Sequence, residues 1–201
     1  DVSRPANIRA VCGFGKSTMI DRLRRLYPRA KILVVTKGET LVVKMVDDLQ
    51  AQGCDCGQVG GGVAPSRHQI GRRVVVTTYQ SVHHCLEGSP YLNRAFDLVI
   101  CDEDHTAGAD SLYKKLLLMS SRAILIGMSA QPEGRMDGSA IRVEGLFGSR
   151  AFELLWPEAI RLGLVVPIEV RWHDVYLDEN PAAKARTTEQ RQRLGIWRNI
   201  E

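Results

Sequence analysis

"AVCGFGKST", residues 10–18, decides the fold, because it gathers two glycines, a lysine and two hydroxyl side chains in nine positions. Ala10 to Ser17 match G-x-x-x-x-G-K-[ST], with Ala10 in place of the first glycine. Backbone N–H groups of such a turn point at phosphate oxygens, and a helix that starts there adds its positive end. We therefore expect a phosphate-binding loop. Its residues are Cys12, Gly13, Phe14, Gly15, Lys16, Ser17 and Thr18.

Short apolar runs alternate with longer helical patterns along the first 130 residues. Val- and Ile-rich runs at 31–36, 73–78, 96–101 and 123–128 predict strands buried on both faces. Helices are predicted at 16–28, 40–53 and 111–121. This alternation predicts a three-layer α/β domain with a mainly parallel central sheet. Beyond it, a short helix is expected to end at Gly163 and to be followed by an extended segment.

The run "FDLVICDEDH", residues 96–105, is a predicted buried strand that ends in three acidic residues and a histidine. Carboxylates at the C-terminal edge of a parallel sheet lie where such folds bind ligands. Beside a phosphate-binding loop, Asp102 is expected to join Ser17 in holding Mg²⁺, and Glu103 to orient or deprotonate an attacking water. Lys16 would contact the β and γ phosphates. The two motifs together predict hydrolysis of a nucleoside triphosphate.

Each motif has a simpler alternative, namely a glycine-rich turn with an incidental lysine and a solvated acidic turn. Taken together, the motifs resemble superfamily 2 helicases and translocases. "DEDH" resembles their D-E-x-H box, residues 32–49 their motif Ia, and "GMSAQP" at 127–132 their motif III. "GGG" at 60–62 and "VVVTTYQSV" at 74–82 resemble the nucleic-acid-facing segments between them. The resemblance spans residues 8–170.

The resemblance implies that residues 1–170 form the first RecA-like domain of an ATP-dependent motor, with Mg²⁺ as cofactor and nucleic acid as partner. It implies that His105 couples the acidic box to motif III, where Ser129 and Ala130 take the first two "SAT" positions and Gln131 replaces threonine. Residues 144–170 resemble the segment after motif III in UvsW-like and restriction-motor proteins. That similarity favours DNA over RNA as the partner.

If the motor interpretation holds, nucleic acid lies on strand-to-helix turns, where backbone N–H groups and short hydroxyl side chains bind phosphates without reading bases. Helix capping and plain loops are the competing explanations. For Tyr79 we favour core packing over base stacking. The candidate contacts are Thr36, Lys37, Gly38, Gly61, Gly62, Thr77 and Thr78.

The composition is that of a water-soluble protein: 201 residues, 44% hydrophobic, net charge +4. Five cysteines without framework spacing predict reduced thiols. With no signal peptide and no apolar run of about 20 residues, we expect no membrane partner and a cytoplasmic location in a bacterial or phage-infected cell.

The resemblance also implies a second RecA-like domain of the full-length protein, which would supply an arginine finger. Residues 171–201 are then expected to be a linker and the start of a connector helix toward it. Two alternatives stay open. One is the ATPase domain of a phage large terminase, and the other is a catalytically silent P-loop module that binds nucleic acid.

Overall fold

The computed structural model describes residues 4–82, 96–130 and 139–167, together with Glu169, Arg171 and Thr187. The chain divides into two compact units, Asp1–Val166 and Pro167–Glu201. The first unit holds the helices and strands described below. In the second unit only Pro167, Glu169, Arg171 and Thr187 are described.

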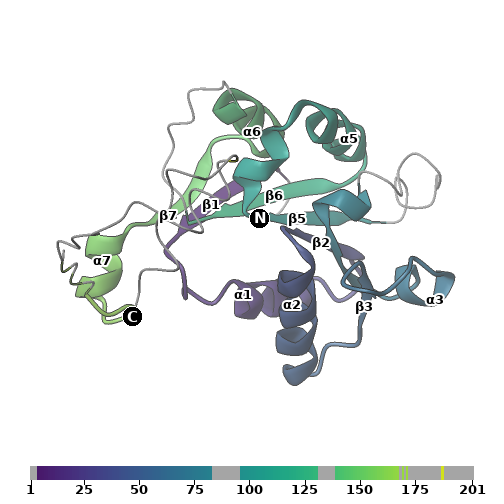
Figure 1. The fold of residues 1–201 in the computed structure, drawn as a ribbon, viewed down its shortest axis with the longest axis horizontal. Helices are drawn as coiled ribbons and strands as arrows, with labels where there is room; N and C mark the ends of the chain where they lie inside the picture. The colour runs from purple at the N-terminus through teal and green to yellow at the C-terminus, as the bar shows by residue number, and fades with distance from the viewer. Residues whose placement is uncertain are drawn as a thin grey trace. The chain divides into compact units, whose positions relative to one another are not determined.

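The first unit is built on a seven-stranded sheet with the order β3-β4-β2-β5-β6-β1-β7, in which every neighbouring pair is parallel (Figure 1). The strands are β1 (Ala6–Ala10), β2 (Ile32–Thr36), β3 (Cys56–Val59), β4 (Val74–Thr78), β5 (Leu98–Asp102), β6 (Ile124–Ser129) and β7 (Arg150–Leu154). The helical elements are α1 (Lys16–Leu26), α2 (Glu39–Ala51), α3 (Arg67–Ile70), η1 (Asp104–Gly108, a 3-10 helix), α5 (Asp110–Ser120), α6 (Ser139–Phe147) and α7 (Trp156–Arg161).

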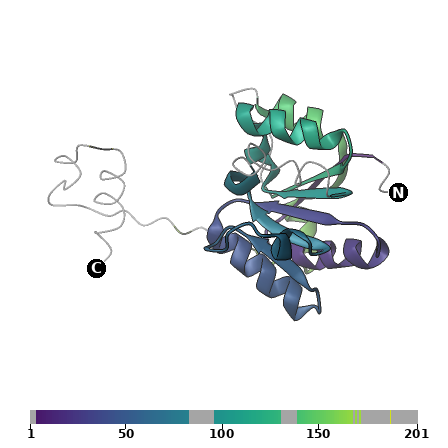
Figure 2. The ribbon, with the colours of Figure 1, turned by 90° about the vertical axis from the view of Figure 1, so that its right-hand side faces the viewer.

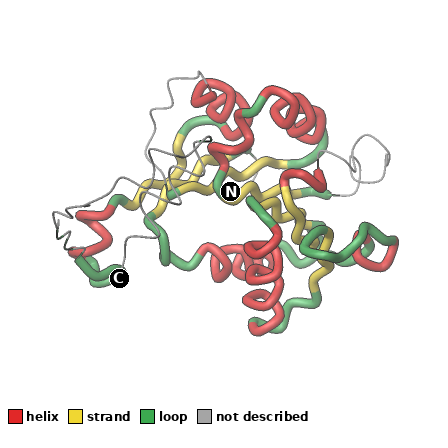
Figure 3. The backbone as a smooth tube through the Cα atoms, viewed as in Figure 1, coloured by secondary structure: helices red, strands yellow, loops and turns green. Residues whose placement is uncertain are grey.

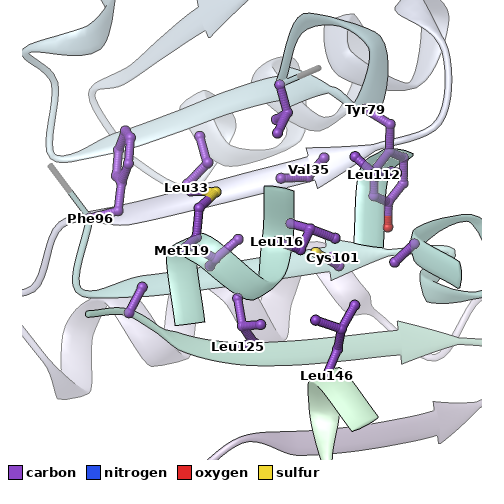
Figure 4. Packing of buried hydrophobic residues seen from close by; sticks show 14 of the residues in the cluster. Leu33, Val35, Tyr79, Phe96, Cys101, Leu112, Leu116, Met119, Leu125 and Leu146 are labelled. Atoms are coloured by element: carbon purple, nitrogen blue, oxygen red, sulfur yellow. The ribbon is translucent and has the colours of Figure 1, made fainter. Parts of the chain in front are cut away.

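Helices cover both faces of the sheet, with α1 and α2 on one side and α5 and α6 on the other (Figure 2). Side chains of a strand point alternately to the two faces, and β2 shows the consequence. Its Leu33 and Val35 pack with the α5 side chains Leu112 and Leu116 (Figure 4), whereas Ile32 and Val34 pack with residues of α1 and α2. Burial on both faces explains why the central strands are continuous apolar runs.

The predicted three-layer α/β fold is confirmed, with a fully parallel sheet in place of a mainly parallel one. The four predicted strands correspond to β2, β4, β5 and β6, and the predicted helices to α1, α2 and α5. Strands β1, β3 and β7, helices α3 and α6 and the 3-10 helix η1 were not predicted; Figure 3 colours the described helices and strands. The segment expected to hold one short helix ending at Gly163 contains β7 followed by α7, which ends at Arg161.

Among the described residues, none of the helices combines the length and the apolar character needed to cross a membrane.

Candidate functional site

The glycine-rich loop follows β1, which lies inside the sheet between β6 and β7. Gly13 and Gly15 adopt positive φ angles of 84° and 95°, which side-chain-bearing residues rarely adopt. Gly15 caps α1, so Lys16 is the first residue of that helix. A Cβ added at Gly13 would meet no atom within 4 Å, which leaves open space beside the loop.

Lys16 joins the loop to the acidic strand end. Its Nζ donates hydrogen bonds to Asp102 Oδ1 at 2.7 Å and to Glu103 Oε1 at 3.2 Å. Burial would lower the pKa of Lys16, but the hydrogen bonds and charges of Asp102 and Glu103 outweigh it, so the pKa lies above its usual value. Lys16 is therefore a firmly charged ammonium. The two motifs meet because β1, β6 and β5 are parallel neighbours whose C-terminal ends share one edge.

Glu103 occupies the turn between β5 and η1. Its backbone is left-handed, with φ 56° and ψ 52°. One carboxylate oxygen accepts from Lys16, and the other lies 3.5 Å from Nδ1 of His105. Glu103 thus stands between the lysine and the histidine of the acidic box, in the position expected of a group that handles a proton near the phosphates.

Asp104 is a buried neighbour that the sequence motifs did not single out. Its Oδ2 accepts a hydrogen bond of 2.9 Å from Nδ2 of Asn7 on β1. Burial raises the pKa of Asp104 to about 6, with Asn7 opposing the rise and the charge of Glu103 adding to it. A Cβ added at Gly127 of β6 would lie 2.5 Å from Asp104 Oδ2. The signals that could have revealed this contact are the polar Asn7 ahead of the loop and the glycine inside an apolar strand.

The remaining loop residues lie around the lysine. Ser17 is half-buried, whereas Cys12, Gly13 and Thr18 are exposed. Phe14 stacks on Phe152 of β7, with ring centroids 5.7 Å apart.

Ser129, the buried last residue of β6, and the half-buried Ala130 lie at the same edge of the sheet. Element η1, which carries His105, packs against β6. Gln131 lies outside the described residues.

The seven candidate nucleic-acid contacts fall into two groups. Lys37, Gly38 and Gly62 are exposed and Gly61 is half-buried. The side chains of Thr36, Thr77 and Thr78, in contrast, are only 0%, 3% and 3% exposed.

The three threonine side chains therefore lie below the surface. Thr78 Oγ1 accepts from the backbone N–H of Ser81 and so caps the helical residues 79–82, the competing explanation given above. Thr36 and Thr77 lie inside strands buried on both faces, which removes their side chains from the surface.

The donor set fits Mg²⁺ and a polyphosphate. Asp102 and Glu103 carboxylates and the Ser17 hydroxyl offer the hard oxygen ligands that Mg²⁺ takes. Lys16 and the first turn of α1 offer the positive charge and backbone N–H groups that phosphates take. Among the described residues, neither this edge of the sheet nor any other place gathers three or more His, Cys, Asp or Glu side chains able to hold a metal ion.

Comparison with known proteins adds a family match. The model described as "Type III restriction enzyme, res subunit" matches residues 2–134. Over 73 residues, 36% of this chain and 13% of the relative, the sequence is 42% identical to "Putative helicase 22" of the Sulfolobus islandicus filamentous virus.

Several solved structures share the fold. The Hef helicase domain of Pyrococcus furiosus superposes with a TM-score of 0.61 at 18% identity, covering 76% of this chain and 35% of that one. The UvsW helicase of bacteriophage T4 gives 0.58 at 23% identity, covering 74% and 54%. The SWI2/SNF2 ATPase core of Sulfolobus solfataricus, solved with double-stranded DNA, gives 0.60 at 11% identity, covering 73% and 32%. The chain thus spans about a third to a half of these structures.

Proposed function

We propose, from the premise that this chain belongs to the type III restriction enzyme res subunit family, that it couples ATP hydrolysis to movement on or remodelling of DNA. The resemblance to superfamily 2 helicases is confirmed by this membership, and the chain is a helicase-type motor domain. The observation that carries the proposal is the contact of Lys16 with Asp102 and Glu103 at one edge of the sheet.

The described side chains divide the chemistry among them. Lys16 holds the β and γ phosphates, and the N–H groups of the loop and of α1 hold the phosphate oxygens. Glu103 accepts the proton of the attacking water or orients that water, and His105 holds its second oxygen. Ser17 and Asp102 would hold Mg²⁺, which neutralises charge on the phosphates when it is bound.

The sharpest test removes the ammonium group that joins the two motifs. Lys16→Ala is expected to weaken ATP binding at least about tenfold in a calorimetric titration with Mg²⁺, since a charged hydrogen bond of about 1.5–3 kcal/mol is lost. Lys44→Ala, which removes an exposed lysine of α2, is the matched control and should bind ATP as the wild type does. Equal affinities for wild type and Lys16→Ala would favour the silent P-loop module and refute the proposal.

The terminase ATPase is the weaker alternative, because the family match is to a restriction-enzyme subunit and the viral relative is named a helicase. Residues 1–170 are proposed as the first RecA-like domain, and 171–201 as the linker to a second one. A chain ending at Val170 should accordingly keep the ATP affinity of the 201-residue chain, and a loss of more than about threefold would place the boundary further on.

For nucleic acid, we propose that the exposed edge formed by Lys37, Gly38, Gly61 and Gly62 holds the phosphate backbone. Gly38 precedes α2, whose N-terminal N–H groups are free to meet a phosphate. Lys37→Ala should weaken binding of single-stranded and duplex DNA alike, and should reduce the slope of log affinity against log salt by about 1. Fluorescence anisotropy across a salt series measures both. An unchanged slope, equal to that of Lys44→Ala, would exclude Lys37 from the contact.

A further inference from the structure

The side chain of Tyr79 connects the end of β4 to the acidic turn. Tyr79 opens the helical residues 79–82 that follow β4 and is only 6% exposed. Its hydroxyl donates a hydrogen bond of 3.0 Å to the backbone oxygen of Asp102. Strand β2 lies between β4 and β5, so the ring reaches across one strand to make this contact (Figure 4).

The carbonyl that receives this hydrogen bond belongs to the peptide between Asp102 and Glu103. There the chain leaves an extended strand and enters the left-handed conformation of Glu103. The orientation of that peptide decides where the Glu103 side chain starts, and therefore whether its carboxylate reaches Lys16 and His105. A non-glycine residue is strained in the left-handed conformation because its Cβ crowds the following carbonyl oxygen, so the turn needs external contacts to persist.

The hydroxyl is well suited to hold this carbonyl. Burial, followed by the neighbouring Cys101 and Asp104, raises the pKa of Tyr79 well above its usual value. The phenol therefore keeps its proton at neutral pH and can donate to the carbonyl. The ring lies in the buried core cluster beside Val35 and Leu112 (Figure 4), which restricts its movement.

We propose that Tyr79 is a positioning residue for ATP hydrolysis, which acts by fixing the Asp102–Glu103 peptide so that Glu103 faces the reacting water. The inference rests on the proposed function. It also ties the carboxylate pair to the end of β4, because Tyr79 opens the helical residues that Thr78, the last residue of β4, caps.

The test is Tyr79→Phe, which removes the hydroxyl and keeps the ring. In single-turnover hydrolysis of radiolabelled ATP with protein in excess, we expect the rate to fall about tenfold, part of the 10²–10⁴ that a positioned general base contributes. The dissociation constant for ATP should stay within about twofold, since Lys16 and the loop are untouched. Tyr113→Phe is the control, because it removes a hydroxyl from a residue of α5 packed against the same core.

The outcomes separate this inference from the function it rests on. If hydrolysis depends on Lys16 and Tyr79→Phe leaves the rate unchanged, or if Tyr113→Phe lowers it equally, positioning by Tyr79 is refuted and the ATPase stands. If wild type and Lys16→Ala do not differ, the ATPase is refuted. Hydrogen exchange then decides on Tyr79. Faster exchange of the Thr106 amide, which donates to the backbone oxygen of Glu103, in Tyr79→Phe but not in Tyr113→Phe supports the fixing of the Asp102–Glu103 turn by Tyr79. Equal exchange in the two variants overturns it.

Discussion

For Glu103, the sequence predicts the position in the fold but not the backbone conformation. Its place beside Lys16 follows from two motifs and the rule that parallel strands end at a common edge. Its left-handed backbone, unique among the non-glycine residues that the structure describes, does not follow from any local pattern. The contacts that stabilise the turn come from Tyr79 and Asn7, which lie 23 and 97 positions away from their partners Asp102 and Asp104. Long-range contacts of this kind have no signature in a short window of sequence.

Gly127→Ala tests the close approach of β6 to the acidic turn. The added Cβ would lie 2.5 Å from Asp104 Oδ2 and 2.8 Å from the Phe147 ring. Overpacking of this kind is expected to lower the free energy of unfolding by about 1–3 kcal/mol, measured by urea denaturation. Gly145→Ala in α6 is the control, because its nearest neighbour would be the Tyr113 hydroxyl at 3.6 Å. The Gly145→Ala change should raise the free energy of unfolding by about 0.5–1 kcal/mol, because alanine is favoured over glycine inside a helix. A similar loss of unfolding free energy in both variants would contradict the close approach at Gly127.

Asp21 gives a pH-dependent prediction. Burial would raise its pKa, but hydrogen bonds from Arg24 and Arg25 outweigh it, so the folded pKa lies below the usual value. A depressed pKa means that the stabilisation is present above the unfolded pKa of about 3.9 and is lost as the pH falls through the folded value. Asp21→Asn should therefore lower the free energy of unfolding by about 1 kcal/mol at pH 7, and by much less near pH 3.

Urea denaturation at the two pH values measures this difference. Asp47→Asn, at an exposed position of α2, is the control and should show no pH-dependent gap. A deficit for Asp21→Asn that is as large at pH 3 as at pH 7 would show that lost packing, and not the carboxylate charge, is responsible.

At the scale of the elements, strands were predictable where both faces are buried. β2, β4 and β5 are buried at every position and read as unbroken apolar runs. β7 is the last strand at one edge of the sheet, and it is exposed at four of its five positions. Its sequence, "RAFEL", is accordingly not an unbroken apolar run. β3, at the other edge, is only four residues long. An edge strand is stabilised by pairing with the strand beside it, so the hydrophobic pattern of its own residues does not predict it.

Helix α5 allows a paired test of the three-layer arrangement. Leu116 is 0% exposed in the core beneath the helix, whereas Leu118 is 67% exposed. Leu116→Ala should lower the free energy of unfolding by about 2–5 kcal/mol, and Leu118→Ala by less than about 0.5 kcal/mol. Thermal and urea unfolding of the two variants measure the contrast. Similar losses would mean that α5 does not present its Leu116 side to the sheet.

For the molecule as a whole, the fold class and the meeting of the glycine-rich loop with the acidic strand end were predictable from the sequence. In phosphoryl transfer an arginine finger contributes about 10³–10⁵ in rate, and in two-domain motors it comes from the second domain. We expect the 201-residue chain to bind Mg²⁺ and ATP weakly and to turn ATP over slowly. Steady-state phosphate release with and without DNA measures this. Substantial DNA-stimulated turnover by this chain would show that all catalytic groups are already present in it.

The parallel sheet also governs the order in which the molecule can assemble. β1 pairs with β6 and β7, so Ala6 finds its partner Ile126 only 120 positions later, and Asn7 meets Arg150 later still. During synthesis, the strand that carries the glycine-rich loop must wait unpaired until most of the chain has left the ribosome. Such distant pairing slows folding and exposes intermediates to aggregation. The glycine-rich loop should therefore be among the last parts of the first unit to acquire its native conformation.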